Sequence, residues 1–213
     1  MRKYDAVFFD LDGTLSESGE GILWCVRRTI EDLKIVVPEN FRLESFIGPP
    51  LADSFYRLGL DDEKVKHGVK TYKSYYDTKG KYMNKAYDGI KELLERLREK
   101  GYKLGVATSK YELFARQIID NIGLLQYFDF VSGATANAER QKKIDVLNYG
   151  IKNLGATPEN SALIGDTKFD AEGARLCGCG FVGVLYGYGT RKEMEAEGAV
   201  NFAETAGKIE KFL

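Results

Sequence analysis

The sequence predicts an α/β fold: a Rossmann-like, three-layer core with a parallel sheet, interrupted by an inserted all-helical domain. Three observations support this prediction. The C-terminal two-thirds repeats one unit, in which an amphipathic helix is followed by a glycine and then a short apolar strand. A continuous apolar run at 7–9 ends at an aspartate, as expected for a buried strand near the N-terminus. Between residues 22 and 76 the apolar residues instead recur at helical spacing.

The core elements are expected in a regular order. Strands are predicted at 6–10, 102–107, 128–131, 161–164 and 181–185, and helices at 90–97, 114–122, 144–154 and 169–177. Asp88 is placed to cap the first of these helices. Because helices alternate with buried strands, we expect a parallel sheet that is covered on both faces.

The predicted insert contains three amphipathic stripes, which begin near Ile22, Leu51 and Val65, and no strand of comparable quality separates them. We therefore expect a core domain at 1–15 and 85–213 and a helical domain at 16–84, which has the size of a small domain. The expected hinges are 13–21 and 79–86.

The composition excludes several classes of protein. Of 213 residues, 44% are hydrophobic and 30% are charged, and the net charge of -1 gives no reason to expect a nucleic-acid or membrane-surface partner. No run approaches the roughly 20 apolar residues of a membrane span. Asp10 and Asp12 interrupt the first apolar stretch, which is too short and too acidic for a signal peptide, and we expect a cytoplasmic protein.

The cysteine and histidine content directs attention to carboxylates. Cys25, Cys177 and Cys179 do not have the spacing of a disulfide framework or a zinc site, so buried thiols are expected. His67 is the only histidine and lies in a lysine-rich helical stretch, where we expect it to be exposed. Chemistry in this chain is therefore expected to depend on Asp and Glu.

The most informative stretch is Asp10-Leu11-Asp12-Gly13-Thr14, which follows the first strand. In open α/β sheets ligands bind at the edge where strands end. Residues two apart in extended chain point the same way, so the two aspartates can converge. Their repulsion then calls for a bound cation or a shared proton. An ordinary turn after a strand is the alternative interpretation, because Asp and Gly are common turn residues.

A second acidic pair follows a later strand, at Asp166 and Asp170. The two residues are four apart, so they can face one region across the first turn of a helix. Helix capping by Asp166 is the alternative, but capping does not explain a second acidic pair at the same sheet edge. The two pairs together favour a site for a hard cation such as Mg²⁺.

These motifs, in this order, resemble the haloacid dehalogenase superfamily across essentially the whole chain. The motifs that carry the resemblance are Asp10 to Thr14, the strand end at Ala107-Thr108-Ser109, a lysine, and Gly165-Asp166 with Asp170. The helical insert resembles the C1-type cap of that superfamily. Two further segments, 47–51 and 184–189, resemble its phosphoglycolate-phosphatase-like branch.

The resemblance implies a role for each motif residue. Asp10 would be the nucleophile that forms an aspartyl-phosphate, and Asp12 the general acid and then the general base. The backbone carbonyl of Asp12 and the carboxylates of Asp10 and Asp166 would hold Mg²⁺. Asp170 would support the metal directly or from behind its ligands. Thr108, with Ser109, would bind the phosphoryl oxygens.

The resemblance also implies a lysine that neutralises the phosphoryl group. Relatives often have Lys-Pro at this point, whereas this chain has Lys142-Lys143 before a helix. A lysine that leads directly into the helix is best matched by Lys143, and Lys142 remains the alternative.

Asp12 indicates phosphoester hydrolysis, because dehalogenases of the superfamily lack this second acid. A sugar phosphomutase or an inorganic pyrophosphatase would use the same core. A phospho-accepting receiver domain is a more distant, non-enzymatic alternative, because in receiver domains the phosphorylated Asp follows a later strand and there is no helical insert.

The expected partner is a small phosphorylated metabolite such as a phosphoglycolate-like monoester, and Gly48 is expected either to face it or to form a plain connecting turn. The sequence does not indicate the oligomeric state.

Overall fold

The computed structural model describes residues 3–137 and 139–213 and divides the chain into two compact units. The core unit comprises Met1–Glu17 and Lys85–Leu213, and the helical unit comprises Ser18–Asn84. Among the described residues, no helix is both long enough and apolar enough to cross a membrane.

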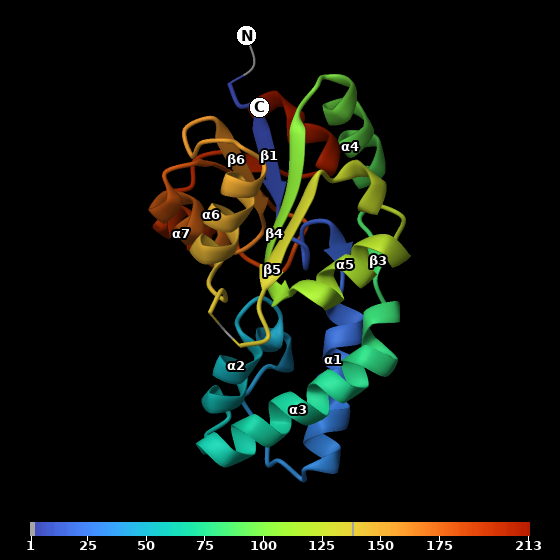
Figure 1. Cartoon of the computed structure of the whole chain (residues 1–213). Coiled ribbons are helices and arrows are strands. Elements are labelled where there is room, and N and C mark those ends of the chain that lie inside the picture. Colours follow the sequence, from blue (N-terminus) through green and yellow to red (C-terminus); the bar gives the residue numbers. More distant parts are fainter. Residues whose placement is uncertain (1–2, 138) are drawn as a thin grey trace. The chain divides into compact units, whose positions relative to one another are not determined.

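The core unit is built on a six-stranded sheet in the order β5-β4-β1-β6-β7-β8. Strands β5, β4, β1 and β6 of this sheet are labelled in Figure 1. All of its strand pairs are parallel. The strands are β1 (Ala6–Phe9), β4 (Lys103–Tyr111), β5 (Phe130–Ala134), β6 (Ser161–Gly165), β7 (Gly180–Val184) and β8 (Phe202–Ala203). The predicted parallel sheet is confirmed, and the two-residue β8 adds an edge strand that the sequence did not indicate.

Helices cover both faces of this sheet. In Figure 1, α6 and α7 lie on one side, and α4 and α5 lie on the other. The helices are α4 (Ile90–Glu99), α5 (Glu112–Asn121), α6 (Lys143–Asn153), α7 (Lys168–Cys177) and the short α8 (Arg191–Ala196). This arrangement confirms the three-layer core.

The strand order places a topological switch point between β1 and β6. These strands are neighbours, and the chain continues from β1 to β4 on one side but from β6 to β7 on the other. In open α/β sheets the crevice at the carboxyl ends of two such strands is where ligands bind. The segments that follow β1 and β6 are those that carry the two predicted acidic pairs.

The pleat of β1 determines which way the next side chain points. Ala6 and Phe8 pack into an apolar cluster with residues of α6 and α7. Phe9 points to the opposite face, where its ring lies 6.2 Å from that of Phe128. Because side chains alternate along a strand, Asp10 follows Phe8 onto the α6 side.

Phe8 is fixed in place by two close backbone approaches. A Cβ on Gly105 of β4 would lie 2.4 Å from Phe8 Cε1, and one on Gly150 of α6 would lie 2.7 Å from the same atom. Neither glycine could carry a side chain without displacing this ring. The strand that leads to Asp10 is therefore held tightly between its neighbour and α6.

A two-stranded antiparallel sheet lies at the points where the chain leaves and re-enters the core unit. It consists of β2 (Ser16–Glu17) and β3 (Lys85–Ala86), and an ion pair of 2.9 Å links Glu17 to Lys85.

The helix α4 begins after Gly89, which has a left-handed conformation with φ of 78°, and no side chain caps this helix. The prediction that Asp88 is the cap is wrong, because the turn at Gly89 separates it from the first helical residue.

The helical unit contains α1 (Gly19–Asp32), α2 (Leu51–Arg57) and α3 (Asp62–Thr78), with 3₁₀ turns at Leu43–Phe46 and Gly80–Tyr82. An edge-to-face contact between Phe46 and Phe55, with ring centroids 5.2 Å apart, lies in its core. His67 is exposed on α3, as expected.

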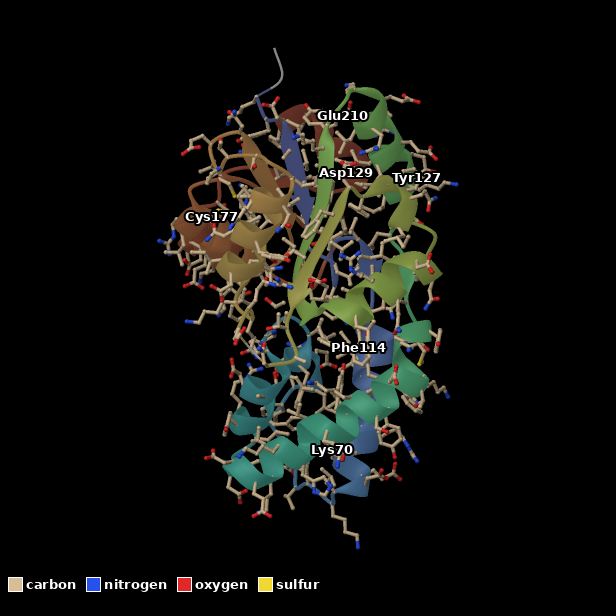
Figure 2. The ribbon with its side chains drawn as sticks, in the orientation of Figure 1. Lys70, Phe114, Tyr127, Asp129, Cys177 and Glu210 are labelled. Carbon is tan, nitrogen blue, oxygen red and sulfur yellow. The ribbon has the colours of Figure 1, made fainter. Side chains whose placement is uncertain are left out.

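The three cysteines differ in their surroundings. Cys25 is fully buried in the helical unit, as expected. Cys177 and Cys179 in the core unit are only half-buried, and the thiol of Cys177, labelled in Figure 2, donates to Asn148 Oδ1 at 3.1 Å. Their partial exposure corrects the expectation of buried thiols at these two positions.

The packing of Phe8 leads to a prediction for Gly150→Ala. In a helix this change usually stabilises a protein by about 0.5–1 kcal/mol. Here the added methyl group meets the Phe8 ring, so we expect a loss of about 1–3 kcal/mol in the free energy of unfolding. Urea denaturation measures the change. Combining it with Phe8→Leu, which removes the ring, should recover part of the loss, and a stabilised single variant would contradict this account.

Candidate active site

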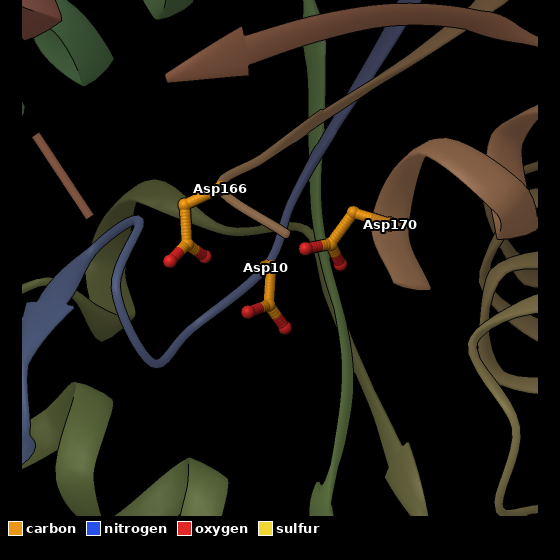
Figure 3. A group of neighbouring side chains, drawn as sticks. All are labelled: Asp10, Asp166 and Asp170. Atoms are coloured by element: carbon orange, nitrogen blue, oxygen red, sulfur yellow. The ribbon is translucent and has the colours of Figure 1, made fainter. Parts of the chain in front are cut away.

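Three buried carboxylates meet at the switch point. One carboxylate oxygen from each of Asp10, Asp166 and Asp170 lies within 4.8 Å of the others. Figure 3 shows the three side chains pointing toward one another from the ends of β1 and β6 and from the start of α7. The exposed fractions are 7%, 0% and 1% in that order. The structure thus brings Asp10 of the first predicted pair together with both members of the second pair.

The turn after β1 depends on Gly13. The Asp10 N–H still donates to Ile164 O of β6 at 2.9 Å, so the chain leaves the sheet only after this residue. Gly13 then adopts a φ of +89°, which favours glycine. A Cβ here would lie 2.2 Å from Asp166 Oδ2. The absence of a side chain at this position is what allows the first motif to approach Asp166.

Asp166 is held through both of its oxygens. The Thr14 hydroxyl donates to Oδ1 at 3.2 Å, and the Tyr188 N–H donates to Oδ2 at 2.7 Å. Burial raises the pKa of Asp166, as do the nearby charges of Asp170 and Asp10, while the two hydrogen bonds lower it. Burial and like charge prevail, so the pKa lies well above its usual range.

Asp170 has a structural role as well as a place in the site. Its Oδ2 accepts from the Thr167 N–H at 3.0 Å and from the Thr167 hydroxyl at 2.7 Å, which closes a capping box at the start of α7. Thr167, and not Asp166, is the N-cap of this helix. Because one of its oxygens is used in the cap, Asp170 is suited to hold the neighbouring groups of the site in place.

Lys143 is the lysine that reaches the carboxylates. Its Nζ lies 2.5 Å from Asp10 Oδ1 and 2.8 Å from Asp170 Oδ1, and it donates to Ala107 O at 2.9 Å. Burial lowers the pKa of Lys143, but the charges of Asp10 and Asp170 outweigh this and raise it above its usual range. Lys142, the alternative candidate, is exposed at the N-cap of α6.

A second lysine, which sequence reasoning missed, contacts Asp12. Lys110 Nζ lies 2.9 Å from Asp12 Oδ2. The other carboxylate oxygen, Asp12 Oδ1, is buried and has no hydrogen-bond partner within residues 3–137 and 139–213. Lys110 therefore fixes one oxygen of Asp12, and the other is buried without a hydrogen bond among the described residues.

Thr108 and Ser109 lie in the second half of β4, directly before Lys110 in the chain. Thr108 is buried, and its hydroxyl accepts from the Lys110 N–H at 3.2 Å, whereas Ser109 is half-buried. The only signal for Lys110 in the sequence is its position two residues after Thr108. The register between β4 and β5 shifts between Ala107 and Tyr111, so strand periodicity alone could not have given its direction.

The charge of the site favours a divalent cation. The carboxylates of Asp10, Asp12, Asp166 and Asp170 carry four negative charges when ionised, and the ammonium groups of Lys110 and Lys143, which contact three of them, offset two. Burial raises the pKa of Asp10 to about 6 although Lys143 lowers it, and Asp170 and Asp12 add to the rise. Buried oxygen donors with surplus negative charge fit a hard cation.

Gly48 lies in the helical unit, where it is exposed and has a φ of +106°. Its contact with a substrate stays a prediction.

Comparison with known proteins extends this account. A family model described as haloacid dehalogenase-like hydrolase matches residues 7–184. A 5'-nucleotidase from Pseudomonas aeruginosa is 34% identical over 212 residues, which cover 99% of this chain and 96% of that protein. A crystal structure described as a predicted phosphatase from Clostridium acetobutylicum has a TM-score of 0.93 and 35% identity, and the match covers 99% of this chain and 98% of that one.

The tyrosine-protein kinase PtkA of Mycobacterium tuberculosis is 37% identical over 183 residues, which cover 86% of this chain but only 62% of that protein. The family model covers most of the chain and includes all the carboxylates and both lysines of the site. The order of the motifs, the switch-point geometry and the family match agree, and this chain belongs to the haloacid dehalogenase-like hydrolase family.

Proposed function

We propose that this protein is a Mg²⁺-dependent phosphatase that hydrolyses a small, phosphoglycolate-like phosphomonoester through an aspartyl-phosphate on Asp10. The observation that carries the proposal is the buried carboxylate group of Asp10, Asp166 and Asp170, with Lys143 against Asp10. The same group supports a phosphatase of this family irrespective of the particular ester.

The metal ligands would come from the ends of β1 and β6. The carboxylates of Asp10 and Asp166, with the backbone carbonyl of Asp12, would hold Mg²⁺, and Asp170 would support them from behind. Bound there, Mg²⁺ would neutralise negative charge on the phosphoryl oxygens. The surplus negative charge of the site and the carboxylate oxygens are the features that fit this ion.

In the first chemical step a carboxylate oxygen of Asp10 attacks phosphorus, and the bond from phosphorus to the ester oxygen breaks. Asp12 donates a proton to that departing oxygen, which leaves as an alcohol. In the second step the Asp12 carboxylate takes a proton from water as the water oxygen attacks phosphorus. The bond between phosphorus and Asp10 then breaks, which releases phosphate and restores both carboxyl groups.

The two lysines would have different tasks. Lys143, beside the nucleophile, would neutralise the phosphoryl oxygens, with the Thr108 hydroxyl as a further donor. Lys110 would position Asp12, since it holds Oδ2, and Oδ1, which has no hydrogen bond among the described residues, would exchange the proton with the reacting oxygen. In this scheme Asp12, which serves as both general acid and general base, is oriented by Lys110 on β4.

The helical unit would act as a cap that closes over the site and determines substrate choice, with Gly48 in a loop that faces the substrate.

A sugar phosphomutase and an inorganic pyrophosphatase would use the same core chemistry. The nucleotidase among the relatives makes nucleoside monophosphates a further class to test. The name of the PtkA relative makes phosphoryl transfer from ATP to a tyrosine a second candidate activity.

A screen for phosphate release tests the proposal. The panel includes 2-phosphoglycolate, other small phosphomonoesters, nucleoside 5'-monophosphates, sugar phosphates and pyrophosphate, with ATP and a tyrosine peptide in a separate transfer assay. We expect phosphate release from small monoesters, and Asp10→Asn should abolish it because the amide cannot attack phosphorus.

Asp120→Asn is the matched control, since Asp120 is exposed on α5, and it should retain activity. An Asp10→Asn variant within tenfold of the wild type would exclude Asp10 as the nucleophile. Preference for pyrophosphate, or sugar phosphate turnover without phosphate release, would favour one of the two alternatives.

Chelation tests the metal. Activity should disappear in excess EDTA and return when Mg²⁺ is added in excess, because the carboxylates and the phosphoryl group need the cation to offset their repulsion. Phosphate release is the measurement, with Ca²⁺ added separately as a comparison for a larger ion. Undiminished turnover in EDTA would argue against metal dependence.

The raised pKa of Asp10 leads to a prediction about the stability of the metal-free protein. In the folded protein the pKa is about 6, against an ordinary value of 3.8, so folding favours the protonated form. The contribution of Asp10 to the free energy of unfolding is fully present below pH 3.8 and is lost as the pH rises to about 6.

Asp10→Asn removes this titration. In EDTA at pH 7 we therefore expect the variant to melt at a higher temperature than the wild type, with the difference shrinking as the pH falls toward 4. Thermal unfolding followed by circular dichroism gives both melting temperatures. A difference that does not change with pH would contradict the assignment of the shift to Asp10.

A further inference from the structure

The segment Tyr186-Gly187-Tyr188-Gly189, here called the tyrosine-glycine loop, follows β7 and has no part in the chemistry described above. It lies directly against Asp166. The Tyr188 N–H donates to Asp166 Oδ2 at 2.7 Å, a charge-assisted hydrogen bond from backbone to a buried carboxylate. A backbone donor of this kind is insensitive to which side chain residue 188 carries.

Both glycines of the loop lie too close to Asp166 to carry a side chain. A Cβ on Gly187 would lie 2.4 Å from Asp166 Cβ, from Asp166 Oδ2 and from Gly13 O. A Cβ on Gly189 would lie 2.1 Å from the Asp166 carbonyl oxygen. Neither glycine has a left-handed φ, so the requirement at these positions is for space and not for an unusual backbone conformation.

Tyr186 connects the loop to the other oxygen of Asp166. Its hydroxyl donates to the carbonyl oxygen of Thr14 at 3.1 Å, and the Thr14 hydroxyl in turn donates to Asp166 Oδ1. The Tyr186 ring lies 4.8 Å from that of Tyr87, which follows β3. The Tyr186 hydroxyl is protonated at neutral pH already with its ordinary pKa, and burial and the charge of Asp166 raise that pKa further.

We propose that the tyrosine-glycine loop is a positioning element of the metal site, which sets the direction of the Asp166 carboxylate so that it meets a divalent cation together with Asp10. The inference rests on the proposed function, because it takes Asp166 to be a metal ligand. One oxygen is fixed directly by the loop and the other through Thr14, so the carboxylate cannot rotate away from its neighbours. A ligand that is oriented before the cation arrives loses less conformational freedom on binding.

The test compares two Gly→Ala variants in the full chain. Gly187→Ala places a methyl group against Asp166, whereas a Cβ on Gly207 meets nothing within 4 Å. Isothermal titration of Mg²⁺ into the substrate-free protein measures the dissociation constant without any turnover. We expect Gly187→Ala to weaken Mg²⁺ binding by about 10–100-fold, the usual effect of disturbing a group that orients a metal ligand, and Gly207→Ala to leave it unchanged.

A pair of Tyr→Phe variants gives a milder test. Tyr186→Phe removes only the hydroxyl that donates to Thr14, and we expect Mg²⁺ binding to weaken by about fivefold. Tyr127→Phe is the control, because Tyr127, labelled in Figure 2, loses an equivalent hydrogen bond to Glu95 on the surface. If circular dichroism shows that Gly187→Ala is unfolded, the Tyr186→Phe result decides.

Three outcomes would overturn the inference. Wild-type Mg²⁺ affinity in folded Gly187→Ala and in Tyr186→Phe would show that the loop only packs against Asp166. Equal weakening in the control variants would show a general effect of stability. A wild-type protein that binds no Mg²⁺ would overturn the proposed cofactor and the inference together, whereas an active Asp10→Asn variant with intact Mg²⁺ binding would leave the loop's role standing.

Discussion

Repulsion between buried carboxylates is the constraint on which this structure depends. Asp10, Asp166 and Asp170 lie within a few ångströms of one another and away from water, an arrangement that raises the pKa values of Asp10 and Asp166. Lys143 offsets part of this repulsion by reaching two of the three carboxylates from the start of α6. The remainder can be relieved only by protons or by a cation, so the fold maintains a site with a strong demand for positive charge.

The architecture explains how such an unfavourable group is kept together. Each carboxylate is attached to an element that is fixed for other reasons. Asp10 continues a strand whose Phe8 ring packs against two glycines, and Asp170 closes the cap of α7. Asp166 accepts one hydrogen bond at each carboxylate oxygen, from two separate segments. Apolar packing and helix capping thereby supply the free energy that holds like charges side by side.

The sequence predicted the fold and the groups that bear charge more fully than the groups that orient them. Helical and strand periodicities give the parallel sheet, and the rule that ligands bind where strands end brings Asp10 and Asp166 to one edge. Lys143 could be chosen over Lys142 because it leads directly into a helix. Lys110 was missed because β4 loses its regular register at that point. The hydrogen bond to Asp166 from residue 188 comes from the backbone, and no side-chain pattern reports such a contact.

The pairing of β2 with β3 has a consequence for how proteins of this architecture can diversify. Ser16 pairs with Ala86, and Glu17 with Lys85, so the two ends of the 18–84 segment are anchored next to each other on the core unit. A segment whose ends are adjacent closes on itself like an ordinary surface loop, and its length has little effect on the entropy of closure. Modules of quite different size and sequence can therefore be exchanged at this junction while the strand order and the catalytic edge are inherited unchanged.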